Sequence, residues 1–299
     1  MTMQKITPHL WFDREAEVAA RFYTSVFKDS KINNTTTLHN TPSGTVDIVT
    51  IELLGQEFML ISAGPLFKFN PSVSFLVACK TKDEVDALWV KLTEGGTALM
   101  EIGEYPFSER YGWVQDRFGL SWQVMSMGGN MIKQKITPTL MFVGKQYGKA
   151  EEAINFYATV FHNAKVGDIL RYSKGEEPDR VGTIKHAAFA LEGLEFAAMD
   201  SAGVHNVAFN EAISFIVHCE MQVEIDYYWG KLSADPNAEQ CGWLKDKYGL
   251  SWQIVPTVME EMLKDKDKER LARVTKAFLK MKKFDIIVLK KAYYGESGA

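Results

Sequence analysis

The chain has 299 residues, and its 46% hydrophobic and 24% charged content is typical of a soluble globular protein with about two domains. The net charge of −4 argues against nucleic acid as a partner, because phosphate binding requires a basic surface. No apolar run approaches the roughly 18 residues of a membrane span, and the N-terminus lacks the basic region and apolar core of a signal peptide. We therefore expect no membrane partner.

Residues 6–62 predict one βαβββ unit. The stretch 6–12, ITPHLWF, alternates and is rich in β-formers, so it predicts a strand with Thr7, His9 and Trp11 on one face. The next segment, EAEVAARFYTSVF, has apolar residues at helical spacing. The turn signals TPSG and LGQ then separate three predicted strands, at about 31–40, 45–54 and 57–62.

Residues 72–126 predict a second βαβββ unit. A strand (72–79) and a helix (82–94) precede a short strand near 97–102, a loop, EYPFSERYG, and two strands at 112–116 and 121–126. Gly119, in the turn DRFGLS, is expected to adopt the left-handed conformation.

The whole plan then occurs again. The stretch WVQDRFGLSWQV begins at Trp113 and WLKDKYGLSWQI at Trp243, 130 residues later, and KITPHLWF is followed at the same interval by KITPTLMF. The interval from Leu232 to Trp243 in the second copy is ten residues shorter than the interval from Leu92 to Trp113 in the first copy. The second copy therefore loses most of one edge strand and its loop. This internal duplication predicts a first domain at 1–127, a second domain at 132–256, and a tail at 257–299.

The tail is charged and carries an apolar stripe of Leu271, Val274, Phe278 and Met281. It predicts two or three short helices, of which Asp285 caps the last and Gly295 ends it. Such a tail needs a surface to bury against, either on its own domain or on a sister chain.

The three cysteines do not form a disulfide framework. Cys79 and Cys219 occupy matching places in the two copies, Cys241 is the odd one, and no CxxC motif occurs. This usage is typical of reduced thiols, so we expect a cytoplasmic protein.

The paired βαβββ units resemble the vicinal-oxygen-chelate superfamily, which has the glyoxalase/bleomycin-resistance fold. Within it the chain resembles the PhnB-like family, often labelled 3-demethylubiquinone-9 3-methyltransferase. The stretches that carry the resemblance are ITPHLWF, EVAARFYTSVF, AGPLFKFNPSVSFLVAC, EVDALWVKL and YGWVQDRFGLSWQV, with their second copies. The resemblance implies an α+β fold in which two modules close a cup that holds the site. It also implies a homodimer, although tandem copies can equally pair within one chain.

In metal-dependent members of the superfamily, ligands lie on the first strand, on the strand that opens the second module, and on the last strand, four residues after the turn glycine. The corresponding residues here are Thr7 or His9, Ser74 and Gln123 in the first copy, and Thr137 or Thr139, Ser214 and Gln253 in the second. A tightly bound divalent metal requires imidazole, thiolate or carboxylate ligands, which hydroxyls and amides do not replace. We therefore expect no metal and no cofactor, but polar pockets that bind an unidentified small molecule.

The predicted ligand-binding residues are His9, Trp11, Ser74, Trp113, Gln123, Thr139, Ser214, Trp243 and Gln253. The tryptophans in this set are predicted pocket walls. By contrast, Trp122 and Trp252 face the helix layer and are predicted core residues, as are Trp89 and Trp229 on the inner faces of helices.

Three functions remain open. The first is a metal-free small-molecule-binding protein of the PhnB-like type. The second is a metal-dependent enzyme of the superfamily, a lyase, isomerase or dioxygenase. The third is the methyltransferase of the family label, which is disfavoured because no GxGxG motif or doubly wound parallel pattern is present.

Overall fold

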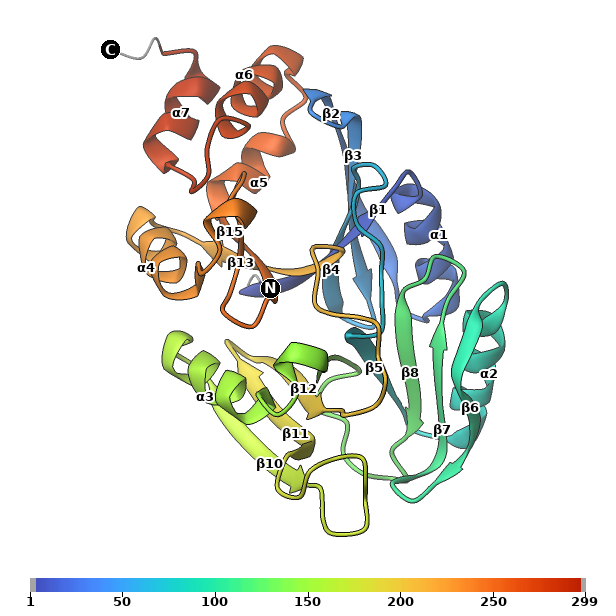
Figure 1. Cartoon of the computed structure of the whole chain (residues 1–299). Coiled ribbons are helices and arrows are strands. Elements are labelled where there is room, and N and C mark those ends of the chain that lie inside the picture. The colour runs from blue at the N-terminus through green and yellow to red at the C-terminus, as the bar shows by residue number, and fades with distance from the viewer. Residues whose placement is uncertain (1–3, 297–299) are drawn as a thin grey trace. The chain divides into compact units, whose positions relative to one another are not determined.

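The computed structural model describes residues 4–296, which form two mixed β-sheets with helices packed against them (Figure 1). The chain divides into two compact units: unit 1 comprises Met1–Thr24, Asp29–Lys68 and Asn210–Ala299, and unit 2 comprises Ser25–Lys28 and Phe69–Phe209. The predicted α+β class with tandem glyoxalase-like modules is confirmed. None of the described helices is long and apolar enough to span a membrane.

The sheet of unit 1 has seven strands in the order β14-β15-β13-β1-β4-β3-β2. Its strands are β1 (Ile6–Phe12), β2 (Lys31–Thr41), β3 (Gly44–Leu53), β4 (Gln56–Ser62), β13 (Ile213–Cys219), β14 (Trp243–Lys245) and β15 (Ser251–Pro256).

The sheet of unit 2 has eight strands in the order β10-β11-β12-β9-β5-β8-β7-β6. Its strands are β5 (Val73–Cys79), β6 (Thr97–Tyr105), β7 (Ser108–Gln115), β8 (Ser121–Ser126), β9 (Ile136–Phe142), β10 (Lys165–Arg171), β11 (Ile184–Leu191) and β12 (Leu194–Asp200).

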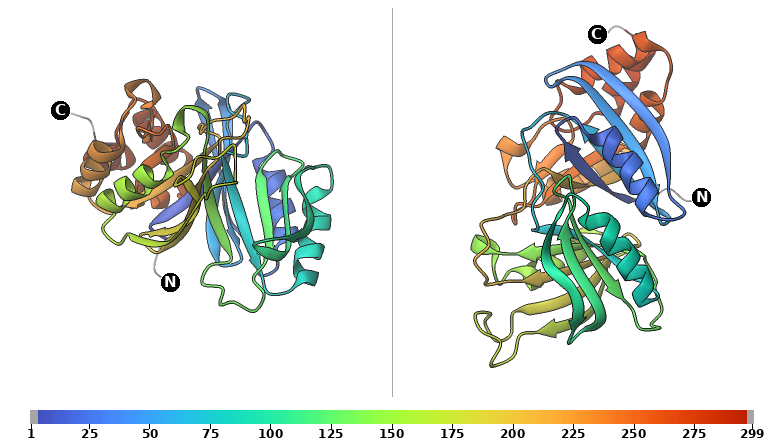
Figure 2. Two further views of the ribbon diagram at one scale, coloured as in Figure 1. Left: turned by 60° about the horizontal axis from the view of Figure 1, so that its bottom comes forward. Right: turned by 90° about the vertical axis from the view of Figure 1, so that its right-hand side faces the viewer.

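One helix accompanies each βαβββ module. These helices are α1 (Ala16–Val26), α2 (Lys82–Thr93), α3 (Ala150–Val160) and α4 (Gln222–Leu232), with two short 3₁₀ turns, η1 (Gly144–Gln146) and η2 (Pro236–Ala238). Helix α2 packs on β7 and β8, and α3 on β11, in unit 2, whereas α4 packs on β15 in unit 1 (Figure 2). In α2, the buried side chains Val85 and Leu92 make this contact, and Thr81 caps the helix.

Each sheet joins modules from different copies of the repeat. In unit 1, β1 of the first copy pairs antiparallel with β13 of the second, with His9 opposite Ser214. In unit 2, β5 of the first copy pairs antiparallel with β9 of the second, with Ser74 opposite Thr139. Figure 1 shows the first of these pairs as the blue strand β1 beside the yellow-orange strand β13. The modules therefore pair within one chain.

The predicted domains 1–127 and 132–256 follow the sequence repeat, and the compact units follow the hydrogen bonds. Each copy contributes its first module to one unit and its second module to the other. The tail, 257–299, belongs to unit 1.

The turn between β7 and β8 in the first copy has the predicted left-handed glycine, and the second copy repeats this turn between β14 and β15. Gly119 has a φ of +84°, and Oδ1 of Asp116 accepts hydrogen bonds from the amides of Phe118 and Leu120. Oδ2 of Asp116 also accepts from the indole of Trp122, which is fully buried. Asp246 makes the same three bonds in the second copy, including one to the buried Trp252.

Two local predictions were wrong. The stretch EYPFSERYG is a β-hairpin, in which β6 extends to Tyr105 and β7 begins at Ser108. Contacts among the rings of Tyr105, Phe107 and Tyr111 stabilise it. Trp89 and Trp229 are only half-buried, and the ring of Trp89 lies against Gly112, where a Cβ would come within 2.5 Å of it.

The tail forms three helices that pack on unit 1, as predicted for the first of the two alternatives. They are α5 (Thr257–Leu263), α6 (Lys268–Phe278) and α7 (Ile286–Tyr294). Asp285 caps α7 through Val288, and Gly295 ends it with a φ of +74°. Val274 and Phe278 of the apolar stripe are buried.

The tail also replaces the edge strand that the second copy has lost. In unit 2, β6 pairs with β7, with Gly103 opposite Tyr111. In unit 1, the amides of Cys241 and Gly242 instead donate to the carbonyls of Met281 and Lys282, at 2.8 and 2.7 Å. The tail therefore satisfies the two backbone donors that immediately precede β14 (Trp243–Lys245).

Fragments 1–129 and 130–299 should form a stable one-to-one complex when they are co-expressed. The pairs β1–β13 and β5–β9 each take one strand from each fragment, so a single fragment exposes two interior strand edges and should self-associate or aggregate. Size-exclusion chromatography with light scattering measures the assembly. A folded, monomeric fragment 1–129 would contradict this view of the sheets.

Candidate functional site

Unit 1 contains a cavity of about 460 Å³ between its sheet and the tail. Most of its wall is apolar, with Leu38, Val46 and Ile61 from the sheet and Met259 and Phe278 from the tail. Polar side chains on the wall come from β1, β2, β13, β15 and α5, and from the loops before β3, β13 and β14. A concave, mostly apolar pocket with a few polar groups is the usual form of a small-molecule site.

The predicted site residues gather in two places, and each place draws on both copies. His9, Trp11, Ser214, Trp243 and Gln253 lie in unit 1. The other four, Ser74, Trp113, Gln123 and Thr139, lie in unit 2. The sequence grouped the candidate residues by copy, whereas each site in the structure combines residues from both copies. The reason is that β13 lies beside β1 and β5 lies beside β9.

In unit 1, four of the five predicted residues line the cavity. The ring of Trp243 makes edge contacts with His9, at 5.3 Å between centroids, and with Trp11, at 6.0 Å. Trp11 also donates through its indole to the carbonyl of Gly64 at 2.7 Å. Ser214 is fully buried, and its hydroxyl accepts a 2.9 Å hydrogen bond from Nε2 of Gln253. Ser214 therefore orients the glutamine that faces the cavity.

His9 is a neutral imidazole on the cavity wall. It is only 2% exposed, and its Nδ1 has no hydrogen-bond partner among the described residues. Burial lowers the pKa of His9 to about 3, because the charged form would lose its hydration. An unpaired buried nitrogen costs free energy unless a ligand or water satisfies it.

In unit 2, the equivalent glutamine is fully hydrogen-bonded by protein groups. Nε2 of Gln123 donates to Ser74 at 2.8 Å, and its Oε1 accepts from the hydroxyl of Tyr111 at 2.7 Å. Trp113 donates to the hydroxyl of Ser121, and the Thr139 hydroxyl makes a long, 3.4 Å bond to a neighbouring carbonyl.

The surroundings of the two glutamines differ at one residue. The residue that corresponds to Tyr111 in the second copy is Cys241, as the stretches RYGW and QCGW show. Consequently, Oε1 of Gln253 has no hydrogen-bond partner among residues 4–296 and remains available to a ligand.

Sequence reasoning missed His218 and Glu260. Nδ1 of His218 on β13 lies 2.6 Å from Oε1 of Glu260 on α5, in a contact that lacks the geometry of a hydrogen bond, and its Nε2 lies 3.0 Å from the hydroxyl of Thr7. Burial alone would raise the pKa of Glu260, but His218 and Lys264 lower it below its usual range. The available signal was that His218 stands where the first copy has Ala78. Glu260 lies in the tail, which has no second copy for comparison.

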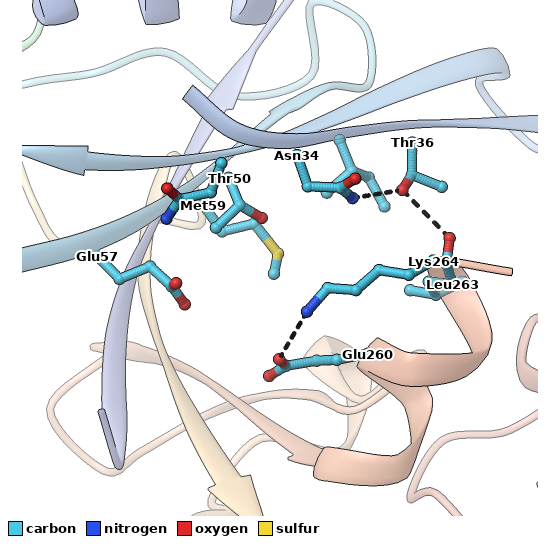
Figure 3. A pocket seen from close by; sticks show the side chains of 10 residues that line it. Asn34, Thr36, Thr50, Glu57, Met59, Glu260, Leu263 and Lys264 are labelled. Atoms are coloured by element: carbon cyan, nitrogen blue, oxygen red, sulfur yellow. Dashed lines mark hydrogen bonds and ion pairs between the residues drawn. The ribbon is translucent and has the colours of Figure 1, made fainter. Parts of the chain in front are cut away.

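A smaller polar chamber of about 390 Å³ adjoins the first cavity in unit 1 (Figure 3). Ile48, Met59, Glu260 and Leu263 line both spaces. The remaining wall of the polar chamber consists of Asn33, Asn34, Thr36, Thr50, Glu57 and Lys264.

The residues at the implied metal positions do not fit a divalent metal. In unit 1 they are His9, Ser214 and Gln253, of which the serine hydroxyl is already bonded to the glutamine. In unit 2 they are all neutral hydroxyls and an amide whose oxygen is occupied by Tyr111. Within the described part of the chain, no three His, Cys, Asp or Glu side chains are grouped so that they could hold a metal ion. The donor set at both positions lacks the charge that such ions require.

Burial of His9 should make the free energy of unfolding decrease as the pH is lowered. Its pKa is near 6.5 in the unfolded chain and about 3 in the folded one, so below pH ~6.5 only the unfolded chain takes up the proton. The difference in stability between the natural protein and His9→Asn should therefore decrease by about 1.4 kcal/mol per pH unit between pH ~6 and ~3. Urea unfolding at several pH values measures it.

The exposed His39 offers a matched control. His39→Asn should leave the pH dependence of unfolding unchanged. Identical pH dependence in His9→Asn and the natural protein would show that His9 is not held neutral by burial.

The comparisons with known proteins agree with this architecture. The family model described as 3-demethylubiquinone-9 3-methyltransferase matches residues 4–125 and 134–255. No curated protein matches the sequence.

Two solved structures illustrate the similarity. A PhnB protein from Bacillus cereus is 41% identical over 41% of this chain and 99% of its own, with a TM-score of 0.39. Glyoxalase I from Zea mays is 12% identical over 86% of this chain and 96% of its own, with a TM-score of 0.54, and it shares the fold. Because the family model matches both copies of the repeat, the chain belongs to the family described as 3-demethylubiquinone-9 3-methyltransferase.

Proposed function

We propose that the chain is a small-molecule-binding protein that takes a largely apolar ligand in the cavity of unit 1 without a metal ion. The observation that carries the proposal is the wall of that cavity, which is mostly apolar and includes two unsatisfied polar atoms, Nδ1 of His9 and Oε1 of Gln253. Natural proteins satisfy nearly all buried polar atoms, so the buried Nδ1 of His9, together with the unpaired Oε1 of Gln253 on the same wall, favours a ligand that bonds them.

The difference between the glutamine sites of unit 1 and unit 2 supports the proposal. In unit 2, Tyr111 occupies the oxygen of Gln123, and the aromatic hairpin β6–β7 lies beside it. In unit 1, Cys241 leaves the oxygen of Gln253 free, and the tail closes around the cavity. The site of unit 1 is therefore the one that a ligand would satisfy.

The enzymatic alternatives have less support in the chemistry of this chain. A metal-dependent lyase, isomerase or dioxygenase would need ligands that neither cup supplies. A methyltransferase of the common type would need a doubly wound parallel sheet, whereas both sheets here are mixed and built from βαβββ modules.

The neutral probe 1-octanol should bind to unit 1. Burial of an alkyl chain contributes about 0.8 kcal/mol per methylene, so the expected Kd is on the order of 0.1 mM after the cost of association. Ala238 lies on the cavity wall, and Ala238→Trp should fill the space and weaken binding at least about tenfold. Quenching of tryptophan fluorescence measures binding, because Trp11 and Trp243 line the cavity.

The exposed Ala234, four residues away, does not line the cavity and gives the control Ala234→Trp. Equal loss of binding in both variants, or no binding of 1-octanol to the natural protein, would remove the support for this site.

The protein should not retain a divalent metal. After incubation with Mn, Fe, Ni, Co and Zn salts and desalting, mass spectrometry should find well below one metal per chain, since neither donor set carries a charge. About one equivalent that is lost in His9→Asn would instead favour the metal-dependent enzyme.

A further inference from the structure

The polar chamber of unit 1 contains two carboxylates and one ammonium group. The end groups of Glu57 from β4 and of Glu260 and Lys264 from α5 and its C-terminal end point into the same space (Figure 3). Lys264 lies 4.0 Å from Oε2 of Glu260, and its side chain is mostly exposed. The formal charges of Glu57, Glu260 and Lys264 sum to one negative charge.

Glu57 is the carboxylate without a partner. Among the described residues its side chain makes no hydrogen bond and no ion pair, although its backbone is held by Gln4. Burial raises the pKa of Glu57, and the nearby Glu260 raises it further. His218 and Lys264 act in the opposite direction but do not outweigh these two effects, so the charged form of Glu57 is only partly compensated.

The adjoining apolar cavity presents acceptors too. Oε1 of Gln253 is an unpaired acceptor, and one of the two N–H groups of its amide donates to Ser214. Nδ1 of the almost fully buried His9 is the second unpaired polar atom on that wall. A ligand that satisfies both spaces therefore needs an apolar body and a group rich in hydrogen-bond donors.

We propose that unit 1 binds an amphipathic amine, whose ammonium group lies between Glu57 and Glu260 in the polar chamber and whose apolar body occupies the larger cavity beside Trp11 and Trp243. This assignment rests on the proposed function of the cavity and adds the chemical class of its ligand. The four residues shared by the two spaces make them neighbours, so one molecule can reach both.

The chemistry separates an ammonium from other polar head groups. An ammonium carries three donors, no acceptor and a positive charge, so it complements two carboxylates. A hydroxyl carries one donor and no charge. A carboxylate would be repelled by Glu57 and Glu260 and would have only Lys264 as a partner.

Three probes of equal chain length test the proposal by isothermal titration calorimetry at pH 7.5: octylamine, 1-octanol and octanoate. Octylamine should bind about tenfold or more tightly than 1-octanol, and octanoate should bind most weakly. Glu57→Gln should lower the affinity for octylamine about tenfold and leave that for 1-octanol within about twofold. Circular dichroism and the melting temperature establish that the variant is folded.

The second copy supplies a matched control for Glu57. Glu195 occupies the equivalent place on β12, opposite Ala190 as Glu57 is opposite Glu52, and Gln134 bonds its carbonyl as Gln4 bonds that of Glu57. Glu195→Gln should leave the affinities for all three probes unchanged.

The outcomes separate the two proposals. Binding of 1-octanol equal to or tighter than that of octylamine, or an octylamine affinity insensitive to Glu57→Gln, would overturn the amine assignment and leave the apolar site standing. No binding of any of the three probes would overturn both.

Discussion

Two antiparallel strand pairs, β1 with β13 and β5 with β9, are the interactions on which the rest of the structure depends. Each pair hydrogen-bonds the first module of one copy to the second module of the other, and so completes a sheet. The register of β1 and β13 places His9 opposite Ser214, and the parallel pairing of β13 with β15 places Gln253 beside them. The composition of the site follows directly from these backbone bonds.

The duplication has produced two cups of similar plan and different chemistry. In the first copy, Tyr111 completes the hydrogen bonds of Gln123, and β6 completes the sheet edge. The second copy has Cys241 in place of that tyrosine and only three residues in β14, and the tail supplies the missing backbone partners. In unit 1 the tail helices form part of the cavity wall, with Glu260 and Phe278 among the lining residues.

The chemistry of the cavity is that of recognition by hydrogen bonding and charge. Its imidazole is held neutral by burial, its amide is oriented by a serine, and its carboxylates lie at one side in a polar chamber. Fully buried polar groups are normally paired, so the unpaired Nδ1 of His9 supports the proposal of a ligand in this cavity. The proposed amine would supply hydrogen-bond donors and a positive charge to these groups.

The sequence by itself determined most of the elements, the duplication and the left-handed turn at Gly119, and it predicted nine site residues, because these inferences depend on local periodicity and on comparison of the two copies. The tertiary structure decided how those residues group, since the strand patterns of both copies are equally compatible with pairing within or between copies. It also brought His218 and Glu260 together across 42 residues, and it left Trp89 half-buried against Gly112. Contacts of this kind depend on which surfaces meet in space, and no local pattern encodes them.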